Sequence, residues 1–395
     1  MRADRILRAR IRHAWDNTAN PVVGRAHTQW DLVRGVPHVV SRVVDDPEAP
    51  TIGYRGFHQG LANVLQLTDV LRARSFPGRV EWTTETPSRS ARRPSRRETA
   101  DIELVGAPRG TVLRSPGEAA VVLPFRVHLV VRTPDLATVR AHVSKRERPR
   151  FNESLRHERF RPRIVRDEAA VVDFFHRMHR PTMQARHAEK SRTESLEAAV
   201  LLASRGGLFL ADDADGPVAG CLYTLRGGVF TTRLLGVRDG ADEHYDSGAF
   251  KALYHLMMQH CALADGVEVM DLFGTEAFCS KGIYQWKRRL GAAVVDAPNH
   301  FGSKELLMTV TRDRPGVRRF LVENPVLVRA SRDLGLLGSP PAADAALRPL
   351  RFVDAGLSPG RAVATTAGGL EPELSVDLDT FLAAPAGTVA RRTVR

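Results

Sequence analysis

Several side chains in the second half of the chain are of the types that transfer protons or bind anions. Asp271 lies at the end of a nearly apolar run, 267–273, which predicts a buried strand. A carboxylate there can orient an amine or receive its proton, and it can equally cap the following turn. Lys281 falls in the first turn of the next predicted helix, where the helix dipole disfavours a cation. A phosphate or an oxyanion is one partner for this lysine, and solvent is the other.

Other residues are candidates for holding phosphate because of their charge or their place at the start of a helix. These candidates are Lys287, Arg288, Ser247, Gly248 and Lys251. The first two lie on a predicted helix over 280–290, beside Trp286, which we expect in the core. The other three open a long helix predicted over 247–264, and a helix N-terminus attracts phosphate. Ser247 is equally compatible with an ordinary helix cap.

The elements that must position these residues alternate regularly from residue 159 onward. Apolar periodicity and turn signals predict both the strands and the helices. The predicted strands are 159–165, 207–211, 217–225, 228–237, 267–273, 293–295 and 306–310, and the predicted helices are 168–179, 195–204, 247–264 and 280–290. Pro181 is expected to end the first of these helices, and the run DDADG at 212–216 predicts a hairpin turn. The order is typical of a mixed, mostly antiparallel sheet flanked by helices.

This order of elements resembles the GNAT (Gcn5-related N-acetyltransferase) fold, and the motifs resemble its Fem-type branch, over roughly residues 140–311. The motifs are the basic stretch Lys145–Arg159, the helix end with Met178, Thr182 and Arg186, the strand end Asp271-Leu272-Phe273-Gly274, and the helix end Trp286-Lys287-Arg288-Arg289-Leu290-Gly291. Fem-type enzymes usually contain two GNAT-like units, one of them degenerate. The resemblance therefore implies a degenerate unit at 1–140 and a catalytic unit at 141–335. The Pro-, Ala- and Gly-rich residues 336–395 are expected to form an extension.

The resemblance also implies a reaction and roles for two further residues. GNAT enzymes form an amide from an activated acyl group, and backbone N–H groups bind the oxyanion where the fourth strand splays from the fifth. This implies that 233–236 faces 269–271, with Gly236 allowing close backbone approach, although Gly236 is equally compatible with a simple bulge. Arg186 matches the arginine at the acceptor site of the family.

The acyl donor is the point at which the chain departs from the common GNAT pattern. Enzymes that use coenzyme A carry an R/QxxGxG/A loop whose backbone N–H groups hold the pyrophosphate. The corresponding segment, 237–248, keeps only Arg238 and Gly240 of that pattern and contains Asp239, Asp242, Glu243 and Asp246. These carboxylates repel a pyrophosphate. Some Fem-type relatives instead take the acyl group from aminoacyl-tRNA, to build cell-wall bridges or small natural products.

The net positive charge of the chain favours aminoacyl-tRNA over acyl-CoA as the donor. The chain has 58 Lys and Arg against 45 Asp and Glu, a net charge of +13. The densest basic segment, 142–166, holds nine Lys or Arg and three Glu, and the spacing of its basic residues from Lys145 to Arg159 predicts a helix with a basic outer face. A second arginine-rich run, 89–97, predicts an exposed loop. A basic chain of this composition is also compatible with an acyl-CoA donor.

Several classes of protein are excluded or disfavoured by composition. No apolar run approaches the ~20 residues needed to span a bilayer, and the basic N-terminus lacks the apolar core of a secretory signal. We therefore expect a cytoplasmic protein. Three cysteines without paired spacing predict reduced thiols and no metal site.

We therefore expect an N-acyltransferase that uses no cofactor beyond its co-substrate, with aminoacyl-tRNA as the donor and a small-molecule amine as the acceptor. The first alternative is an acyl-CoA-dependent N-acetyltransferase. The second, of another class, is a basic RNA-binding module that kept the fold without catalysis.

Overall fold

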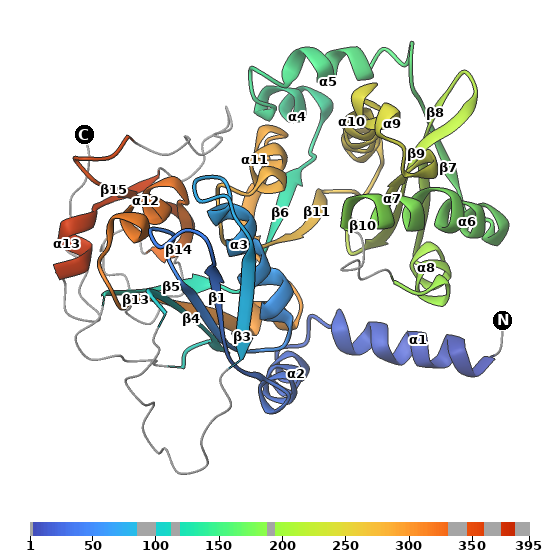
Figure 1. Ribbon diagram of the computed structural model, residues 1–395. Coiled ribbons are helices and arrows are strands. Elements are labelled where there is room, and N and C mark those ends of the chain that lie inside the picture. The colour runs from blue at the N-terminus through green and yellow to red at the C-terminus, as the bar shows by residue number, and fades with distance from the viewer. Residues whose placement is uncertain are drawn as a thin grey trace.

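The computed structural model describes residues 3–84, 100–111, 119–187, 194–330, 346–358 and 373–383 (Figure 1). These residues form two large β-sheets with helices packed on them, and a small third sheet. The arginine-rich run 89–97 lies outside the described residues.

The first large sheet has six strands in the order β3-β1-β2-β4-β13-β5. Its strands are β1 (Val36–Val43), β2 (Ile52–Gly56), β3 (Val80–Thr84), β4 (Ile102–Pro108), β5 (Ala119–Pro124) and β13 (Lys304–Val310). The N-terminal helical elements are α1 (Ala3–Asp16), α2 (Pro21–Val33), the π-helical segment η1 (Leu61–Leu65) and α3 (Gln66–Arg72).

The second large sheet has seven strands in the order β12-β6-β11-β10-β9-β8-β7. Its strands are β6 (Val127–Arg132), β7 (Arg161–Val165), β8 (Gly206–Asp213), β9 (Gly216–Arg226), β10 (Val229–Val237), β11 (Val269–Thr275) and β12 (Ala293–Asp296). The helical elements between these strands are α4 (Leu136–His142), α5 (Arg148–Ser154), α6 (Glu168–Phe174), the π-helical η2 (Phe175–His179), α7 (Arg180–His187), α8 (Leu196–Ala203), the 3-10 turn η4 (Arg238–Gly240), α9 (Asp242–Asp246), α10 (Ala249–Leu263) and α11 (Gly282–Arg289).

The remaining elements follow the second sheet along the chain. They are the 3-10 turn η5 (His300–Ser303), α12 (Pro315–Glu323), β14 (Val326–Ala330), β15 (Ala346–Val353), β16 (Leu374–Asp377) and α13 (Leu378–Ala383). Strands β14, β15 and β16 make the third sheet. The extension predicted from residue 336 therefore contributes two strands and a helix among its described residues.

The two large sheets share the same pattern of pairing. Each contains one parallel pair, β2 with β4 in the first sheet and β10 with β11 in the second, and its other neighbouring strands are antiparallel. This mixed, mostly antiparallel arrangement, flanked by helices, confirms the predicted fold class.

The sheets exchange strands across the middle of the chain. Strand β6 follows β5 directly but pairs with β11 and β12 in the second sheet. Strand β13, which comes after the second sheet in sequence, pairs with β4 and β5 in the first. The sequence predicted 306–310 as a closing strand with 293–295; this is wrong, because β13 and β12 lie in different sheets. The predicted division at residue 140 remains a prediction, and strands cross it in both directions.

One contiguous hydrophobic core joins the two sheets. Buried residues from both belong to a single cluster, including Phe57 and Leu104 of the first sheet and Leu129 and Phe230 of the second. The exchanged strands lie within this cluster, so they connect the halves through buried side chains and through backbone hydrogen bonds.

The two parallel pairs differ in how far their strands stay together: β2 and β4 remain close, whereas β10 and β11 separate after three paired positions. In the first sheet, β2 and β4 stay so close that a Cβ added at Gly56 would lie 2.3 Å from the Gly106 carbonyl oxygen. Gly56 also has a φ of 120°, which a side chain disfavours. The Tyr54 side chain fills the space beside Gly60. A ligand site between parallel strands is therefore expected in the second sheet.

Local signals explain most helix boundaries around that sheet. Asp167 and Ser195 cap α6 and α8 by accepting backbone N–H groups, as their side chains commonly do at helix starts. The predicted end at Pro181 is wrong, because the helix continues through η2 into α7 and ends at His187. A π-helical turn just before Pro181 accommodates the missing proline N–H. The basic helix predicted across Lys145–Arg159 is also shorter, since α5 covers only Arg148–Ser154.

Within the described ranges, none of the helices combines the length and the apolar character that a membrane span requires.

Candidate active site at the diverging strands

The candidate site lies where β10 and β11 separate. The two strands pair in parallel over only three positions, Val229 to Thr231 with Val269 to Asp271. Beyond this point β10 continues along β9 to Val237, while β11 continues along β6 to Thr275. Parallel strands that diverge leave backbone groups and space between them for a ligand.

Both strands become irregular at the point of divergence. The register of β10 against β9 shifts between Thr232 and Leu234, which makes a bulge at Arg233. The register of β11 against β6 shifts between Asp271 and Gly274, and Phe273 there has a φ of 67°. The Arg233 guanidinium lies 4.8 Å from the centre of the Phe273 ring. The sequence predicted that 233–236 faces 269–271; this is wrong, because the pairing partners of 269–271 are 229–231.

Asp271 lies at the last paired position and is almost fully buried. One carboxylate oxygen accepts the backbone N–H of Phe273 at 2.8 Å. The other lies 2.7 Å from His128 Nδ1, a residue of β6. Thr232 donates its hydroxyl to the Asp271 carbonyl oxygen at 3.2 Å, so it ties β10 to β11 at the same level. The cap role considered from the sequence is thus present, and the side chain also has a histidine partner.

Lys287 is a buried cation directly behind this point. Its side chain comes from α11, and its ammonium donates to the Leu272 carbonyl and, at 3.3 Å, to the Phe273 carbonyl. Burial lowers the pKa of Lys287 to about 7, and the nearby Asp271 carboxylate opposes that shift. An ammonium has three donors, so one remains beyond these two bonds.

Lys281 is a second lysine at the start of α11 that acts on this region, and it pairs with the carboxylate of Glu276. It occupies the N-cap position of α11 without a side-chain cap bond, and it forms an ion pair with Glu276, which follows β11. The Arg126 guanidinium lies 3.9 Å from the other oxygen of Glu276. The lysine and the arginine together hold the pKa of the Glu276 carboxyl below its usual value despite burial, which acts to raise it. Glu276 therefore accounts for a cation at an unfavourable helix end.

Arg288 is placed in the core. Only 3% of it is exposed, and it donates to the Ala292 carbonyl oxygen, which closes the end of α11. The donor-binding role predicted for Arg288 finds no support in this position. Trp286 packs edge-on against the ring of Tyr254 at 4.7 Å, as its predicted core role requires.

The other predicted residues gather around the start of α10. Arg186 pairs with Asp242 at 2.7 Å and lies 3.9 Å above the Tyr245 ring. Ser247 donates its hydroxyl to the His244 carbonyl at 3.1 Å, which leaves α10 without a side-chain cap. Gly248 takes the left-handed conformation, with a φ of 86°, just before α10. Lys251 lies half-buried in the first turn of α10.

Gly236 lies where β10 passes under the π-helical turn η2. A Cβ at this position would lie 2.5 Å from the Met178 carbonyl carbon and 2.6 Å from the His179 nitrogen. His179 also bonds the neighbouring Leu235 carbonyl through Nδ1 at 2.9 Å. Gly236 thus allows the backbone of β10 to approach another backbone closely, as the sequence suggested. That other backbone belongs to η2 and not to the facing strand.

Replacing Gly236 by alanine is expected to lower the free energy of unfolding by about 1–3 kcal/mol, because backbone atoms must move to admit the methyl group. Chemical denaturation measured by circular dichroism would test this. Gly282→Ala is the matched control, since no atom lies within 4 Å of the Cβ there. Equal stability of both variants would contradict the packing argument.

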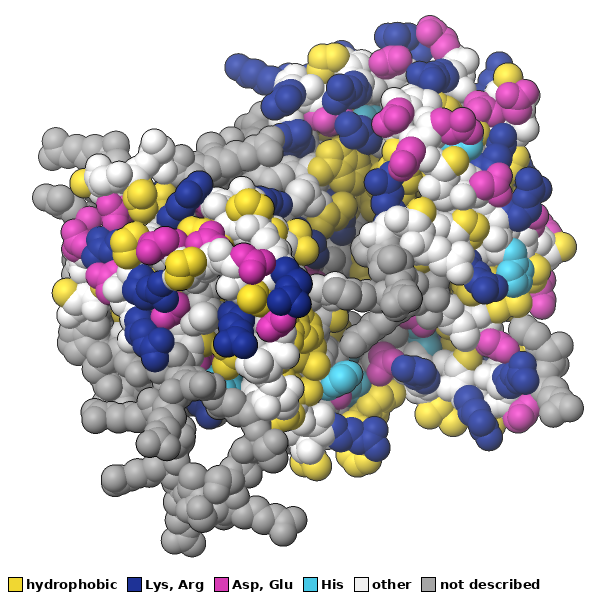
Figure 2. Space-filling view, viewed as in Figure 1, with side chains coloured by type: hydrophobic (Ala, Val, Ile, Leu, Met, Phe, Trp, Pro, Cys, Tyr) yellow, Lys and Arg dark blue, Asp and Glu magenta, His cyan; other side chains and the backbone are white. Residues whose placement is uncertain are grey.

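The surface in front of the site is hollow and partly hydrophobic. Figure 2 shows hydrophobic side chains at the bottom of a depression between the regions that α10 and α11 occupy in Figure 1. Half-buried rings of the two helices also lie near each other, with the ring centres of Phe250 and Trp286 6.1 Å apart.

Sequence reasoning missed the partners of the predicted residues. His128 lies on a strand of the first half, and Arg126 and Glu276 carry no motif. Only the alternating run around residue 127 signalled a strand, and nothing in it indicated which sheet that strand would join.

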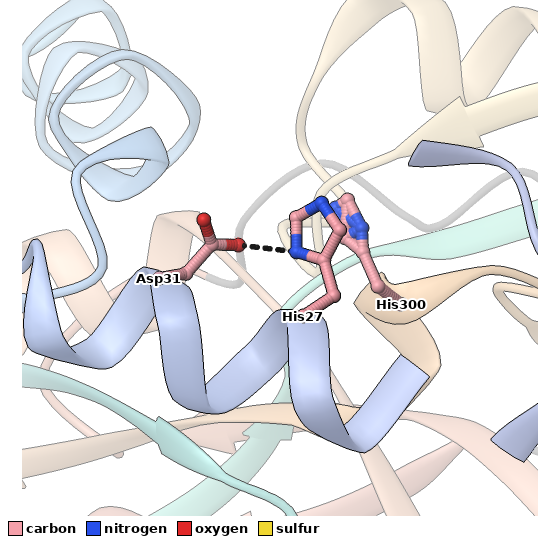
Figure 3. A group of neighbouring side chains, drawn as sticks. All are labelled: His27, Asp31 and His300. Atoms are coloured by element: carbon pink, nitrogen blue, oxygen red, sulfur yellow. Dashed lines mark ion pairs between the residues drawn. The ribbon is translucent and has the colours of Figure 1, made fainter. Parts of the chain in front are cut away.

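A second buried cluster contains possible metal ligands: His27, Asp31 and His300 (Figure 3). Their ligand atoms lie within 4.8 Å of one another. The two imidazole rings are stacked 3.7 Å apart and nearly parallel, so one ion cannot lie in the planes of both. Asp31 also pairs with the ammonium of Lys304. We therefore interpret this cluster as a structural contact between α2, η5 and β13.

The three cysteines are buried and free. Burial raises the pKa of each thiol, to about 12 for Cys221 and Cys279. These thiols are therefore protonated at neutral pH, which fits the structural role predicted for them.

The second sheet is a mixed, mostly antiparallel sheet whose parallel pair diverges, which is the fold class predicted from the sequence. No protein-family model matches the sequence, and no curated protein matches it. Several solved structures are similar to the chain. FemX is 10% identical with a TM-score of 0.36, over 69% of this chain and 84% of that chain. L-PGS from Bacillus licheniformis is 9% identical with a TM-score of 0.32, over 72% and 84%. A GCN5-related N-acetyltransferase from Sphaerobacter thermophilus is 14% identical with a TM-score of 0.27, over 70% and 78%.

Proposed function

We propose that the chain is an N-acyltransferase that joins an activated acyl group to an amine at the diverging strands. The observation that carries this proposal is the group at the end of the three-residue pairing, where the Asp271 carboxylate lies near the buried ammonium of Lys287, which donates to the next two carbonyls of β11. The parallel pair of the first sheet is closed, which supports placing the reaction in the second.

Amide formation makes two electrostatic demands that these residues can meet. The attacking nitrogen must lose a proton, and the tetrahedral intermediate develops an oxyanion. We assign the third N–H of the Lys287 ammonium as the donor that binds this oxyanion. Burial strengthens the interaction of the ammonium with a developing negative charge. Arg186, at the start of α10, remains our candidate for orienting the acceptor.

We propose aminoacyl-tRNA as the donor. Carboxylates precede α10, and the side chains of Asp242 and Glu243 are 81% and 78% exposed, which disfavours a pyrophosphate at that helix end. By contrast, Lys145, Arg146 and Arg150 near α5 are exposed, and among the described residues no carboxylate lies within 4 Å of them. Helix α5 packs against α10, so these cations lie on the side of the molecule where α10 runs.

Incubation with charged tRNA or with acyl-CoAs separates the candidate donors. The protein would be mixed with a pool of charged tRNA, or with a panel of acyl-CoAs, together with small amines from a cell extract, and new amides would be identified by mass spectrometry. We expect products from the charged tRNA alone. Products from acyl-CoA alone would overturn the donor assignment. Tight RNA binding without any product would favour the non-catalytic binding module.

Reversing the charge of Lys145, Arg146 and Arg150 to glutamate is expected to weaken tRNA binding at least about tenfold at 50 mM salt and to reduce the salt dependence of binding, because each phosphate contact releases a counterion. Filter binding over a range of salt concentrations measures both effects. Arg163→Glu is the control, since Arg163 already pairs with Asp212 across β7 and β8. An unchanged salt dependence in the triple variant would argue against this surface.

A further inference from the structure

His128 and Asp271 form a buried pair that is built from the two halves of the chain. Each is 4% exposed, and Nδ1 of the histidine lies 2.7 Å from a carboxylate oxygen of the aspartate. The two residues are 143 positions apart, and they meet only because β6 joins β11 in the second sheet.

The surroundings of this pair determine which ring nitrogen carries the proton. An ionised carboxylate only accepts hydrogen bonds, and Asp271 already accepts the N–H of Phe273. His128 Nδ1 must therefore be the donor, so a neutral ring has its lone pair on Nε2. No described residue bonds Nε2, and that atom keeps a contact with solvent. The imidazole is thus oriented by a carboxylate and has an accessible basic nitrogen.

The pair also lies at the point where the strands diverge. Asp271 occupies the last position paired with β10, and the Phe273 ring packs edge-on against His128 at 5.0 Å. Lys287 donates to the carbonyl of Phe273, and the Asp271 carboxylate is close enough to raise the pKa of this lysine against the effect of burial. A proton acceptor and an oxyanion donor are therefore both next to the same short stretch of β11.

We propose that His128 is a catalytic general base of the transfer and that Asp271 is its positioning residue, an inference that rests on the proposed function. As the amine nitrogen bonds to the acyl carbon, its proton moves to His128 Nε2. The tetrahedral intermediate then breaks the bond from the acyl carbon to the donor oxygen, and the same proton moves to that leaving oxygen. The products are the amide and the free hydroxyl of the donor, so protons and electrons balance.

The competing explanation is that the pair only fastens β6 to β11. Kinetics distinguish the two roles, because a structural bond changes stability without changing the protonation that the rate depends on. The chain supplies a matched control in His38, whose Nε2 lies 3.0 Å from Glu103 in the first sheet, away from the diverging strands.

The test compares His128→Gln, Asp271→Asn and His38→Gln in the charged-tRNA assay between pH 5 and 9, with nitrogen NMR of the histidine rings in the intact protein. We expect His128→Gln to lower kcat by about 10²-fold or more and to change the shape of the pH–rate profile relative to the wild type. Asp271→Asn should lower the rate and shift the His128 proton away from Nδ1. His38→Gln should leave kcat and the pH profile unchanged.

Each outcome decides a different claim. Wild-type rate and pH profile in His128→Gln, or a proton found on Nε2 in the wild type, would overturn the role of His128 and leave the acyltransferase function in place. No product from the wild-type protein with either donor would overturn the proposed function, and the role of His128 with it. Circular dichroism of each variant confirms that a lost rate is not a lost fold.

Discussion

Replacing Lys287 by methionine is expected to reduce the rate of acyl transfer by about 10²–10³-fold, the usual cost of losing one oxyanion donor in an active site. The side chain is buried and its ammonium lies against the carbonyls of β11, so no other described lysine can take its place there. The fold should survive, because the substitution removes a cation that burial disfavours. The measurements are kcat with the charged-tRNA pool and the midpoint of thermal unfolding.

The pH dependence gives this prediction a second test. Burial lowers the pKa of Lys287 to about 7, so the ammonium loses its proton as the pH rises through 7. Activity that depends on its charge should therefore fall above pH 7 in the wild type. Lys287→Arg keeps the charge at every pH and should lose this fall, although the larger side chain lowers the rate. If Lys287→Met retains the wild-type rate, the oxyanion role is wrong.

The second large effect concerns stability rather than catalysis. Lys304→Met is expected to lower the free energy of unfolding by about 3–5 kcal/mol, because it leaves the buried Asp31 carboxylate without its ammonium partner and with His27 as its remaining ion-pair partner. The lysine ammonium pairs with Asp31 and lies 4.7 Å and 4.8 Å from the rings of Phe57 and Phe301. Burial lowers the pKa of Lys304, and Asp31 opposes this shift. Chemical denaturation at neutral pH measures the effect.

Two further variants show whether the charge or the packing is responsible. The double variant Asp31→Leu, Lys304→Met should recover at least half of the lost stability, since both charges are then removed. Arg163→Ala breaks an ion pair whose arginine side chain is 47% exposed, and it should cost less than about 1 kcal/mol. If Lys304→Met were no more destabilising than Arg163→Ala, the pair would not hold α2 against the first sheet.

Individual helices and turns could be predicted from short stretches of sequence. The apolar periodicity over 247–264 predicted α10, found at Ala249–Leu263, and the run DDADG predicted the turn between β8 and β9. These elements depend on hydrogen bonds and side chains a few residues apart, so a single stretch of sequence contains the information. Each strand and helix predicted between residues 161 and 296 is present in the predicted order, while α7, η4 and α9 were not predicted.

The pairing of the strands could not be predicted from the sequence, because it depends on residues far apart in the chain. The apolar run around residue 127 predicts a strand equally well in either sheet, and only its pairing with β11 and β12 places it in the second. The sequence also placed 233–236 opposite 269–271, whereas the structure pairs 229–231 with 269–271. The positions at which two distant strands face each other leave no clear signal in composition.

By itself, the sequence determined the charge of the chain, the types of its helices and strands, and the presence of Asp271 and Lys287 at the ends of two of them. The tertiary structure alone decided that Lys287 would be buried, that Arg288 would close a helix in the core, and that Asp271 would meet His128. The physical reason is that pKa, burial and partnership depend on what surrounds a side chain in space. Here those surroundings come from strands exchanged between the two sheets.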